Sequence, residues 1–313
     1  MQVVQSIHEL IGSTPLLELT TFTLPNQTKI FAKLEFYNPG GSVKDRLGMA
    51  LLENAIKTGK LIKGGTVIEP TAGNTGIGLG LAALKYHVNA LFVVPEKFSV
   101  EKQALMKALG AKIVYTPTAD GMKGAIKKAN ELALDIPNSY LPEQFQNVAN
   151  PNAYYHTLGP ELIKQLDGKI DVFVAGAGTG GTFTGVARYL KEQLKQVKTV
   201  VVEPEGSILN GGQAASHDTE GIGLEFIPNF MDPSLFDDIH TVQDTAAFRL
   251  VKELAQKEGL FVGSSSGAAM YASLLEAQKA KPGSTIVTIF PDSSERYLSK
   301  HIYAYETESE RLN

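Results

Sequence analysis

A lysine near the start of an expected helix is the residue best suited to covalent chemistry. The stretch 37–55 reads YNPGGSVKDRLGMALLENA, where Ser42 and Asp45 resemble a capping box and apolar residues follow at helical spacing. The helix should start at Ser42 and hold Lys44 in its first turn, where the helix dipole disfavours a cation by roughly 0.3–1 kcal/mol. The dipole and the neighbouring Arg46 should lower the pKa of Lys44, which makes the amine a better nucleophile toward an aldehyde and a better general base. A solvated lysine is the alternative that this stretch leaves open.

Three turns rich in glycine or serine could bind anions. Each is expected to join a strand to a helix, and they read EPTAGNTGIG (69–78), AGAGTGGT (175–182) and VGSSSGAA (262–269). Free backbone N–H groups and the positive helix end make such turns anion sites, which gather at the carboxyl ends of the strands in an open α/β sheet. Pyridoxal phosphate (PLP) bound to an amino acid has two anions, and it needs an amine for a Schiff base and a partner for its pyridine nitrogen. The three turns and Lys44 together match these needs.

Two other functions would use the same turns. Gly176, Gly178 and Gly181 fit the pattern G-x-G-x-x-G after a strand, and Glu203 ends the next strand. A nicotinamide-dependent oxidoreductase is therefore a competing hypothesis. It leaves unexplained both Lys44 and the asparagine–threonine turn at 73–76. A non-catalytic metabolite sensor is the third hypothesis, because an inactive site can keep its binding turns.

The composition is that of an ordinary globular protein. The chain has 313 residues, a formal net charge of -4 and no basic run that would indicate nucleic acid. No uncharged apolar stretch reaches the ~18 residues of a membrane span, and the first residues do not form a signal peptide, so we expect a cytoplasmic protein. The absence of cysteine excludes thiol nucleophiles and thiolate ligands, and the six histidines are scattered. We therefore expect no metal site and no nucleic-acid or membrane partner.

Short apolar runs alternate with amphipathic stretches along most of the chain. This alternation predicts an α/β protein with a mostly parallel sheet and helices on both faces. The expected strands cover 65–70, 90–95, 111–116, 171–176, 198–204 and 283–290. The polar stretch 141–154, which contains two prolines, interrupts the alternation, and we expect it to cross between two domains.

Six motifs occur together in order along the chain. They read NPGGSVKDR (38–46), EPTAGNTGIGLGLAA (69–83), QALMKALGAKIV (103–114), GAGTGGTFTG (176–185), GIGLEFIP (221–228) and GSSSGAA (263–269). Together they closely resemble the PLP-dependent β-family (fold type II), which includes the O-acetylserine sulfhydrylases, or cysteine synthases, and the cystathionine β-synthases. The resemblance covers nearly the whole chain. It implies two α/β domains, each with a twisted, mostly parallel sheet flanked by helices, and family members are usually homodimers. The smaller domain would span 35–145, the larger one would comprise 1–34 and 146–313, and the cofactor would lie in the cleft between them.

The resemblance also implies a role for each residue that matches a family motif. Lys44 would hold the cofactor as an internal aldimine and then act as the general base that leads to an aminoacrylate, to which a thiol adds. The phosphate would be bound by Gly178, Thr179, Gly180, Gly181 and Thr182, the cofactor's 3′-oxygen by Asn74, and the pyridine nitrogen would face Ser266. Thr71, Gly73, Thr75 and Gln144 would receive the substrate carboxylate, and Ala72, Asn74, Gly221 and Glu225 complete the substrate-binding set.

Two residues bear on the choice of thiol within this family. Cysteine synthases tend to have glycine where Glu225 stands, and many relatives have serine where Ala72 stands. A carboxylate near the entrance could pair with the ammonium of homocysteine, although a solvated loop glutamate explains Glu225 equally well. We therefore predict that serine or O-acetylserine is joined to homocysteine to give cystathionine. Synthesis of cysteine from O-acetylserine and sulfide is the alternative.

Overall fold

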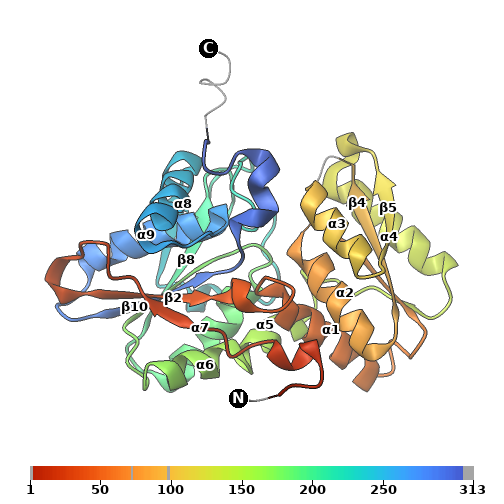
Figure 1. Cartoon of the computed structure of the whole chain (residues 1–313), viewed down its shortest axis with the longest axis horizontal. Helices are drawn as coiled ribbons and strands as arrows, with labels where there is room; N and C mark the ends of the chain where they lie inside the picture. Colours follow the sequence, from red (N-terminus) through yellow and green to blue (C-terminus); the bar gives the residue numbers. More distant parts are fainter. Residues whose placement is uncertain (1–2, 72, 97–98, 306–313) are drawn as a thin grey trace, which may run out of the picture.

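The computed structural model describes residues 3–71, 73–96 and 99–305, which form two lobes, each built on its own sheet (Figure 1). The larger sheet has the strand order β1-β2-β10-β7-β8-β9, and within it only β1 and β2 pair antiparallel. The smaller sheet has the order β5-β4-β3-β6 and is parallel throughout. The predicted α/β fold with two mostly parallel sheets is confirmed.

The strands are short, as in most open sheets of this class. In chain order they are β1 (Leu16–Glu18), β2 (Lys29–Leu34), β3 (Thr66–Pro70), β4 (Asn89–Pro95), β5 (Lys112–Thr116), β6 (Ser139–Tyr140), β7 (Val172–Gly176), β8 (Lys198–Pro204), β9 (Asp238–Val242) and β10 (Thr285–Phe290).

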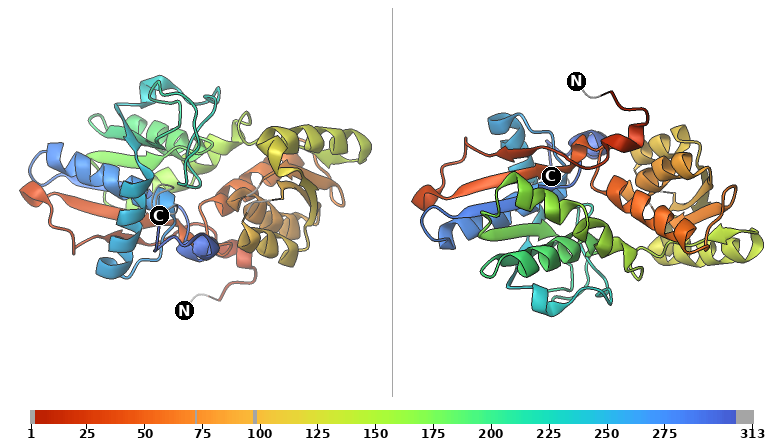
Figure 2. Two further views of the ribbon diagram at one scale, coloured as in Figure 1. Left: turned by 90° about the horizontal axis from the view of Figure 1, so that it is seen from above. Right: turned by 90° about the horizontal axis from the view of Figure 1, so that it is seen from below.

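Helices flank both sheets (Figures 1 and 2). The α-helices are α1 (Lys44–Lys57), α2 (Asn74–Tyr86), α3 (Val100–Ala108), α4 (Gly121–Asp135), α5 (Ala149–Tyr155), α6 (Leu158–Gln165), α7 (Gly181–Gln193), α8 (Asp244–Glu258) and α9 (Ser264–Lys279). Short 3-10 turns are η1 (Ile7–Leu10), η2 (Pro25–Gln27), η3 (Glu35–Tyr37), η4 (Thr118–Asp120), η5 (Pro233–Leu235) and η6 (Ser294–Lys300). In the part of the chain that the structure describes, no helix is both long and apolar enough to cross a membrane.

The six strands expected from the sequence are confirmed as β3, β4, β5, β7, β8 and β10. Strands β1, β2, β6 and β9 were not expected. β2 reads KIFAKL, and its Lys33 is fully buried at a position where an apolar residue is typical of a central strand. β6 has only two residues, and β9 carries Asp238 and His240, so neither has the apolar run that indicates a strand.

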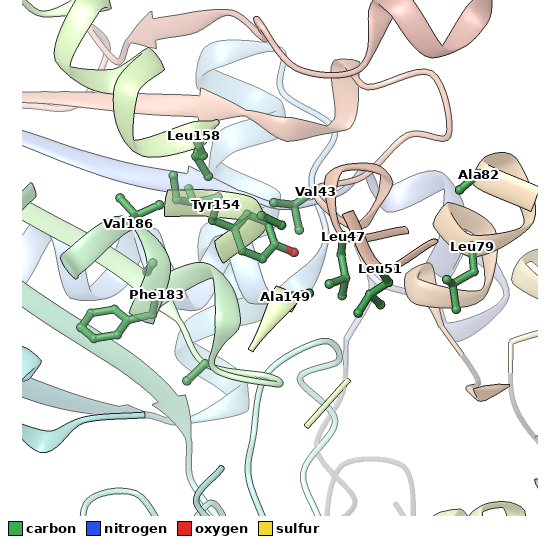
Figure 3. Close-up of a cluster of buried hydrophobic side chains, with 14 of the residues drawn as sticks. Val43, Leu47, Leu51, Leu79, Ala82, Ala149, Tyr154, Leu158, Phe183 and Val186 are labelled. Carbon is green, nitrogen blue, oxygen red and sulfur yellow. The ribbon is translucent and has the colours of Figure 1, made fainter. Parts of the chain in front are cut away.

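One hydrophobic cluster continues from the smaller lobe into the larger one. It contains Phe92 of β4 and Phe173 of β7, and Figure 3 shows its middle part, where Tyr154 of α5 lies near Val43 and Leu47 at the start of α1. Because α1 packs on both α2 and α5, it links the two lobes. The segment before α1 is therefore held against both lobes, next to the cleft between them.

Helices α1 and α2 touch through their backbones. A methyl group at Gly48 would lie 2.2 Å from the carbonyl oxygen of Gly78, and one at Gly78 would lie 2.3 Å from the carbonyl oxygen of Lys44. Only glycine permits such an approach. The contact brings the first residue of α1 beside the second turn of α2.

The predicted start of α1 at Ser42 is wrong. The helix begins at Lys44, and Ser42 lies before it and forms a β-bridge with Asp292. In a capping box the Asp45 carboxylate would accept from the backbone N–H of Ser42. Here it accepts from the backbone N–H of Gly40 instead. Lys44 nevertheless lies in the first turn of the helix, as predicted.

The two sheets draw on different parts of the chain. The strands of the smaller sheet lie between residues 66 and 140, and those of the larger sheet lie outside that range. The stretch 141–148 leads from β6 to α5, which packs on α7 of the larger lobe. The domain boundaries at 35 and 145 stay a prediction.

Candidate active site

A cavity of about 470 Å³ lies between the two lobes. Of the predicted site residues it is lined by Lys44, Thr71, Gly73, Asn74, Thr75, Gln144, Gly178, Thr179 and Gly221. A smaller cavity of about 30 Å³ shares Lys44, Gly178, Thr179 and Gly221 with it and adds Gly180 and Thr182. The structure thus brings together residues from segments that lie far apart in the sequence.

The other predicted residues that the structure describes line neither cavity. Gly181 begins α7 behind the turn, and Ser266 is fully buried in the first turn of α9. Glu225 is exposed on the loop 221–228. Ala72 lies outside the described residues.

The amine of Lys44 has a shifted pKa. Burial lowers the pKa of Lys44 from 10.5 to about 8, and the negative charge of Asp292 partly offsets this effect. At pH 7 the neutral fraction rises from about 0.03% to about 10%, which favours nucleophilic and general-base chemistry. The predicted direction of the shift is confirmed, but its cause is burial rather than Arg46.

Arg46 is instead bound by acidic side chains away from the cavity. Its guanidinium donates to Glu35 at 2.8 Å and to Glu161 at 2.7 Å, and Lys33 also pairs with Glu161 at 2.8 Å. These contacts raise the pKa of Arg46 and lower that of Glu161 to about 2, although burial opposes both shifts. Since Arg46 follows Lys44 by two residues, the network anchors the first turn of α1.

The asparagine turn joins β3 to α2 and faces the cavity. Thr71 and Thr75 are buried, and the Thr75 hydroxyl donates to the Gln144 side-chain oxygen at 2.8 Å. Among the described residues, and apart from its chain neighbours, no atom lies within 4 Å of where a Gly73 Cβ would be, so the backbone there is open to the cavity. The arrangement offers hydroxyl, amide and backbone N–H groups to an anion such as a carboxylate.

The second glycine turn joins β7 to α7 and is packed on its outer side. A Cβ at Gly178 would lie 2.2 Å from the Gly221 oxygen, and one at Gly180, whose φ is +77°, would lie 2.1 Å from the Met231 sulfur. The turn therefore requires glycine, and it precedes the N-terminus of a 13-residue helix at the edge of both cavities. Such a turn suits a phosphate.

The same turn does not suit a dinucleotide. The Glu203 carboxylate accepts from the backbone N–H groups of Leu209 at 2.8 Å and Asn210 at 3.0 Å, and from the Thr241 hydroxyl at 3.0 Å. It is also buried. Because these donors occupy the carboxylate, Glu203 holds a loop in place and is not free to bind a ribose.

The serine turn is not preceded by the predicted strand, but it contains a buried hydroxyl without a partner in the described chain. It follows a loop after α8 rather than a strand, so the predicted strand before it is wrong. The Ser266 oxygen is fully buried and has no hydrogen-bond partner within the described chain. A buried hydroxyl usually has a partner, so this one is suited to a ligand atom.

Sequence reasoning missed several residues at the cavity. Asp292 lines it, and both Asp292 and Arg296 bond to the side chain of Asn74. Lys102 and Glu220 line it too and form an ion pair of 2.8 Å. Asp292 and Arg296 belong to the segment PDSSERYLS (291–299), a stretch of charged and hydroxyl residues directly after a buried strand. Polar residues placed directly after a buried strand could have indicated that this segment contributes to the site.

These residues fit PLP. The turn at 178–182 would hold the phosphate, Lys44 would present its amine to the aldehyde, and the unpartnered Ser266 hydroxyl would face the ring nitrogen. When bound, PLP supplies an electrophilic aldehyde and an electron sink. An α/β fold with two sheets, a lysine in the cleft and a glycine turn before a helix together define a PLP-binding enzyme of the two-lobed class.

Comparison with known proteins identifies the family. Residues 7–292 match the family described as "Pyridoxal-phosphate dependent enzyme". The chain is 61% identical over 303 residues to the O-acetylserine dependent cystathionine beta-synthase of Bacillus subtilis (strain 168), covering 97% of this chain and 99% of that protein. It is 54% identical over 305 residues to a cysteine synthase of Helicobacter pylori (strain ATCC 700392 / 26695), covering 97% of this chain and 100% of that protein.

Solved structures agree with these relatives. The crystal structure of the O-acetylserine dependent cystathionine beta-synthase from Helicobacter pylori superposes with a TM-score of 0.92 at 54% identity, covering 97% of this chain and 100% of that one. A cysteine synthase from Entamoeba histolytica superposes with a TM-score of 0.94 at 38% identity, covering 98% and 93% of the two chains. The chain belongs to the family of pyridoxal-phosphate-dependent enzymes, and it is a PLP-dependent β-replacement enzyme.

Proposed function

We propose that the protein joins serine or O-acetylserine to homocysteine and releases cystathionine. The relative at 61% identity is named an O-acetylserine dependent cystathionine beta-synthase, which supports this choice. In this proposal the amino-acid donor occupies the cavity of about 470 Å³, with its carboxylate at Thr71, Gly73, Thr75 and Gln144. Ala72, Asn74 and Gly221 complete the donor site.

Lys44 moves the proton at the donor's α-carbon. Its lowered pKa of about 8 leaves a useful fraction of neutral amine, so Lys44 takes the α-proton and later returns it. General-base catalysis of this kind contributes about 10²–10⁴-fold to a rate. Asn74 binds the 3′-oxygen of the cofactor, and the turn at 178–182 binds its phosphate.

A second cavity next to the site is the observation that favours homocysteine over sulfide. It has a volume of about 710 Å³ and shares His217, Glu220, Tyr297 and Lys300 with the first cavity. At this junction Glu220 pairs with Lys102 at 2.8 Å and with Lys300, so groups of both signs stand there. Homocysteine carries an ammonium and a carboxylate that must be matched on entry, whereas sulfide needs no such groups.

Cysteine synthesis from O-acetylserine and sulfide is the second candidate, because the relative from Helicobacter pylori strain ATCC 700392 / 26695 is named a cysteine synthase. The deciding experiment supplies the purified, PLP-loaded protein with serine or O-acetylserine, each crossed with homocysteine or sulfide, and identifies the products by mass spectrometry. We expect cystathionine as the main product and a higher kcat/KM for homocysteine than for sulfide. Formation of cysteine without cystathionine would overturn the proposal.

Glu225 is proposed as the partner of the homocysteine ammonium, from its exposed position on the loop 221–228. Glu225→Gly should raise KM for homocysteine about 10- to 100-fold, the worth of a charge-assisted hydrogen bond, and should change KM for sulfide much less. Glu205→Gly is the matched control, because Glu205 is equally exposed but lies in the turn after β8, outside the loop 221–228. Equal effects of Glu225→Gly with both acceptors would remove Glu225 from the acceptor site.

A homodimer is also proposed from the family resemblance, and the cytoplasmic location expected from the sequence stays a proposal. Light scattering coupled to gel filtration would measure the mass in solution, for which twice 33.7 kDa is expected. A mass of one chain would contradict the dimer.

A further inference from the structure

Four side chains form a hydrogen-bonded cluster beside Lys44, which joins the two lobes across the cavity. Asn74 is the first residue of α2 in the smaller lobe, whereas Asp292, Arg296 and Tyr297 follow β10 in the larger lobe. The Asn74 nitrogen Nδ2 donates to Asp292 Oδ2 at 2.6 Å, and Arg296 donates to Asn74 Oδ1 at 2.7 Å. The Tyr297 hydroxyl donates to the same oxygen of Asp292. Asp292 and Arg296 are both buried, with exposures of 1% and 7%.

The chemistry of these partners leaves one orientation for the Asn74 amide. A carboxylate only accepts hydrogen bonds and a guanidinium only donates them. With the amide reversed, its oxygen would face the Asp292 carboxylate and its NH₂ group would face the Arg296 guanidinium, so both contacts would become repulsive. The amide nitrogen carries two hydrogens, and Asp292 uses one of them.

We propose that Asp292 and Arg296 are positioning residues that fix the Asn74 amide so that it turns an N–H, and not its oxygen, toward the cavity. Asn74 lines that cavity, and the N–H left free by Asp292 is the donor available to a ligand. This donor suits an anionic oxygen of the ligand. The inference rests on the role proposed above for Asn74, which is binding the 3′-oxygen of PLP.

Both positioning residues are themselves held in place. Arg296 also donates to the carbonyl oxygen of Gly40, and a Cβ at Gly41 would collide with the Arg296 guanidinium at 2.3 Å. Asp292 pairs with Ser42 in a β-bridge, and the Val43 N–H donates to the carbonyl oxygen of Pro291 at 2.9 Å. The segment that carries Lys44 and the segment that orients Asn74 are therefore tied to each other.

A charge swap separates orientation of the amide from simple support of the fold. Asn74→Asp alone places two carboxylates within 2.6 Å of each other and should lower the melting temperature of the protein by about 5 °C or more. In the double variant Asn74→Asp with Asp292→Asn, the amide introduced at position 292 donates one N–H to the carboxylate introduced at position 74, which Arg296 still binds. Its second N–H faces the Tyr297 hydroxyl, which donates to Asp292 in the wild type and would accept in the variant. The contacts between the lobes return, but the group facing the cavity is now an oxygen.

We expect the double variant to regain most of the melting temperature of the wild type. Its visible absorption band with PLP bound should remain shifted from that of the wild type, and its kcat/KM for O-acetylserine should stay about 10- to 100-fold lower. Asp292→Asn alone is the matched comparison. Because Arg296 still donates to the Asn74 oxygen, the Asn74 amide keeps its orientation, and this single variant should shift the absorption band less. Recovery of the wild-type band and activity in the double variant would show that the cluster only supports the fold, and would overturn the inference.

Asn74→Ala removes the donor without introducing a charge, so it tests the inference even if the aspartate variants fold poorly. Its PLP absorption band should shift as in the double variant, and a wild-type band would overturn the inference. This spectroscopic result is independent of the acceptor. A wild type that makes no cystathionine would refute the proposed function, while the bands of the variants would still decide the role of Asp292 and Arg296.

Discussion

The backbone contact between α1 and α2 predicts a strong effect of one methyl group on activity. In Gly78→Ala the new Cβ would lie 2.3 Å from the Lys44 carbonyl oxygen and 2.7 Å from its carbonyl carbon. Ordinary contact begins near 3.4 Å, so the start of α1 must move away by about 1 Å. The atoms that must move are backbone atoms, which cannot rotate away as the end of a side chain can.

This displacement acts on the catalytic lysine directly. A misplacement of about 1 Å costs roughly 10²-fold in rate, so we expect kcat/KM for β-replacement to fall about 100-fold. The free energy of unfolding should fall by about 0–2 kcal/mol, because overpacking costs about 1–3 kcal/mol and replacing glycine by alanine inside a helix returns about 1 kcal/mol. The assays are steady-state kinetics with O-acetylserine and the preferred thiol, together with thermal melting of the PLP-loaded protein.

Gly80→Ala is the matched control, two residues farther along the same helix. Its new Cβ would meet the Leu109 side chain at 3.2 Å, and a leucine side chain can yield by a few tenths of an ångström. Activity should stay within about twofold of the wild type, since Lys44 is not displaced. Full activity in Gly78→Ala would refute the claim that this glycine contact positions Lys44.

Three further outcomes are expected. Gly180→Val should abolish retention of PLP on dialysis, followed by visible absorbance, because φ is +77° at Gly180 and a Cβ there would collide with the Met231 sulfur; normal retention would contradict the assignment of the phosphate turn. In cofactor-free protein, the reaction of the Lys44 amine with an aldehyde reagent should reach half its maximal rate near pH 8, because burial lowers the pKa of Lys44 to about 8; a midpoint near 10.5 would contradict this. Burial raises the pKa of the Glu69 carboxyl from 4.5 to about 8, so the folded state binds the extra proton and loses stability as the pH rises from about 4.5 to 8. Glu69→Gln should reduce this loss in thermal melts at pH 5 and pH 8, and an unchanged difference between the two melting temperatures would refute it.

The sequence by itself determined the parts of the protein that depend on local pattern. The apolar runs LFVV in β4 and VVV in β8 are strands in the structure, because parallel strands buried on both faces are continuously apolar. The glycine turn at 178–182 was recognised from its composition, since glycine alone suits both a positive φ and a close backbone approach. The order of the motifs along the chain resembles that of the PLP-dependent β-family, and this resemblance supported PLP as the cofactor.

Only the tertiary structure determines which distant side chains contact the residues of these local motifs and which of those residues are buried. Asp292 bonds to Asn74 across 218 residues of sequence, and nothing in either local stretch specifies the other. Glu203 fits a dinucleotide pattern by its spacing, but in the fold its carboxylate accepts hydrogen bonds from the backbone N–H groups of residues 209 and 210. The pKa of Lys44 falls because the folded chain buries the amine, and Arg46, its neighbour in sequence, turns away to Glu35 and Glu161. Burial and long-range pairing arise when distant segments pack together, so they cannot be predicted from the spacing of residues along the chain.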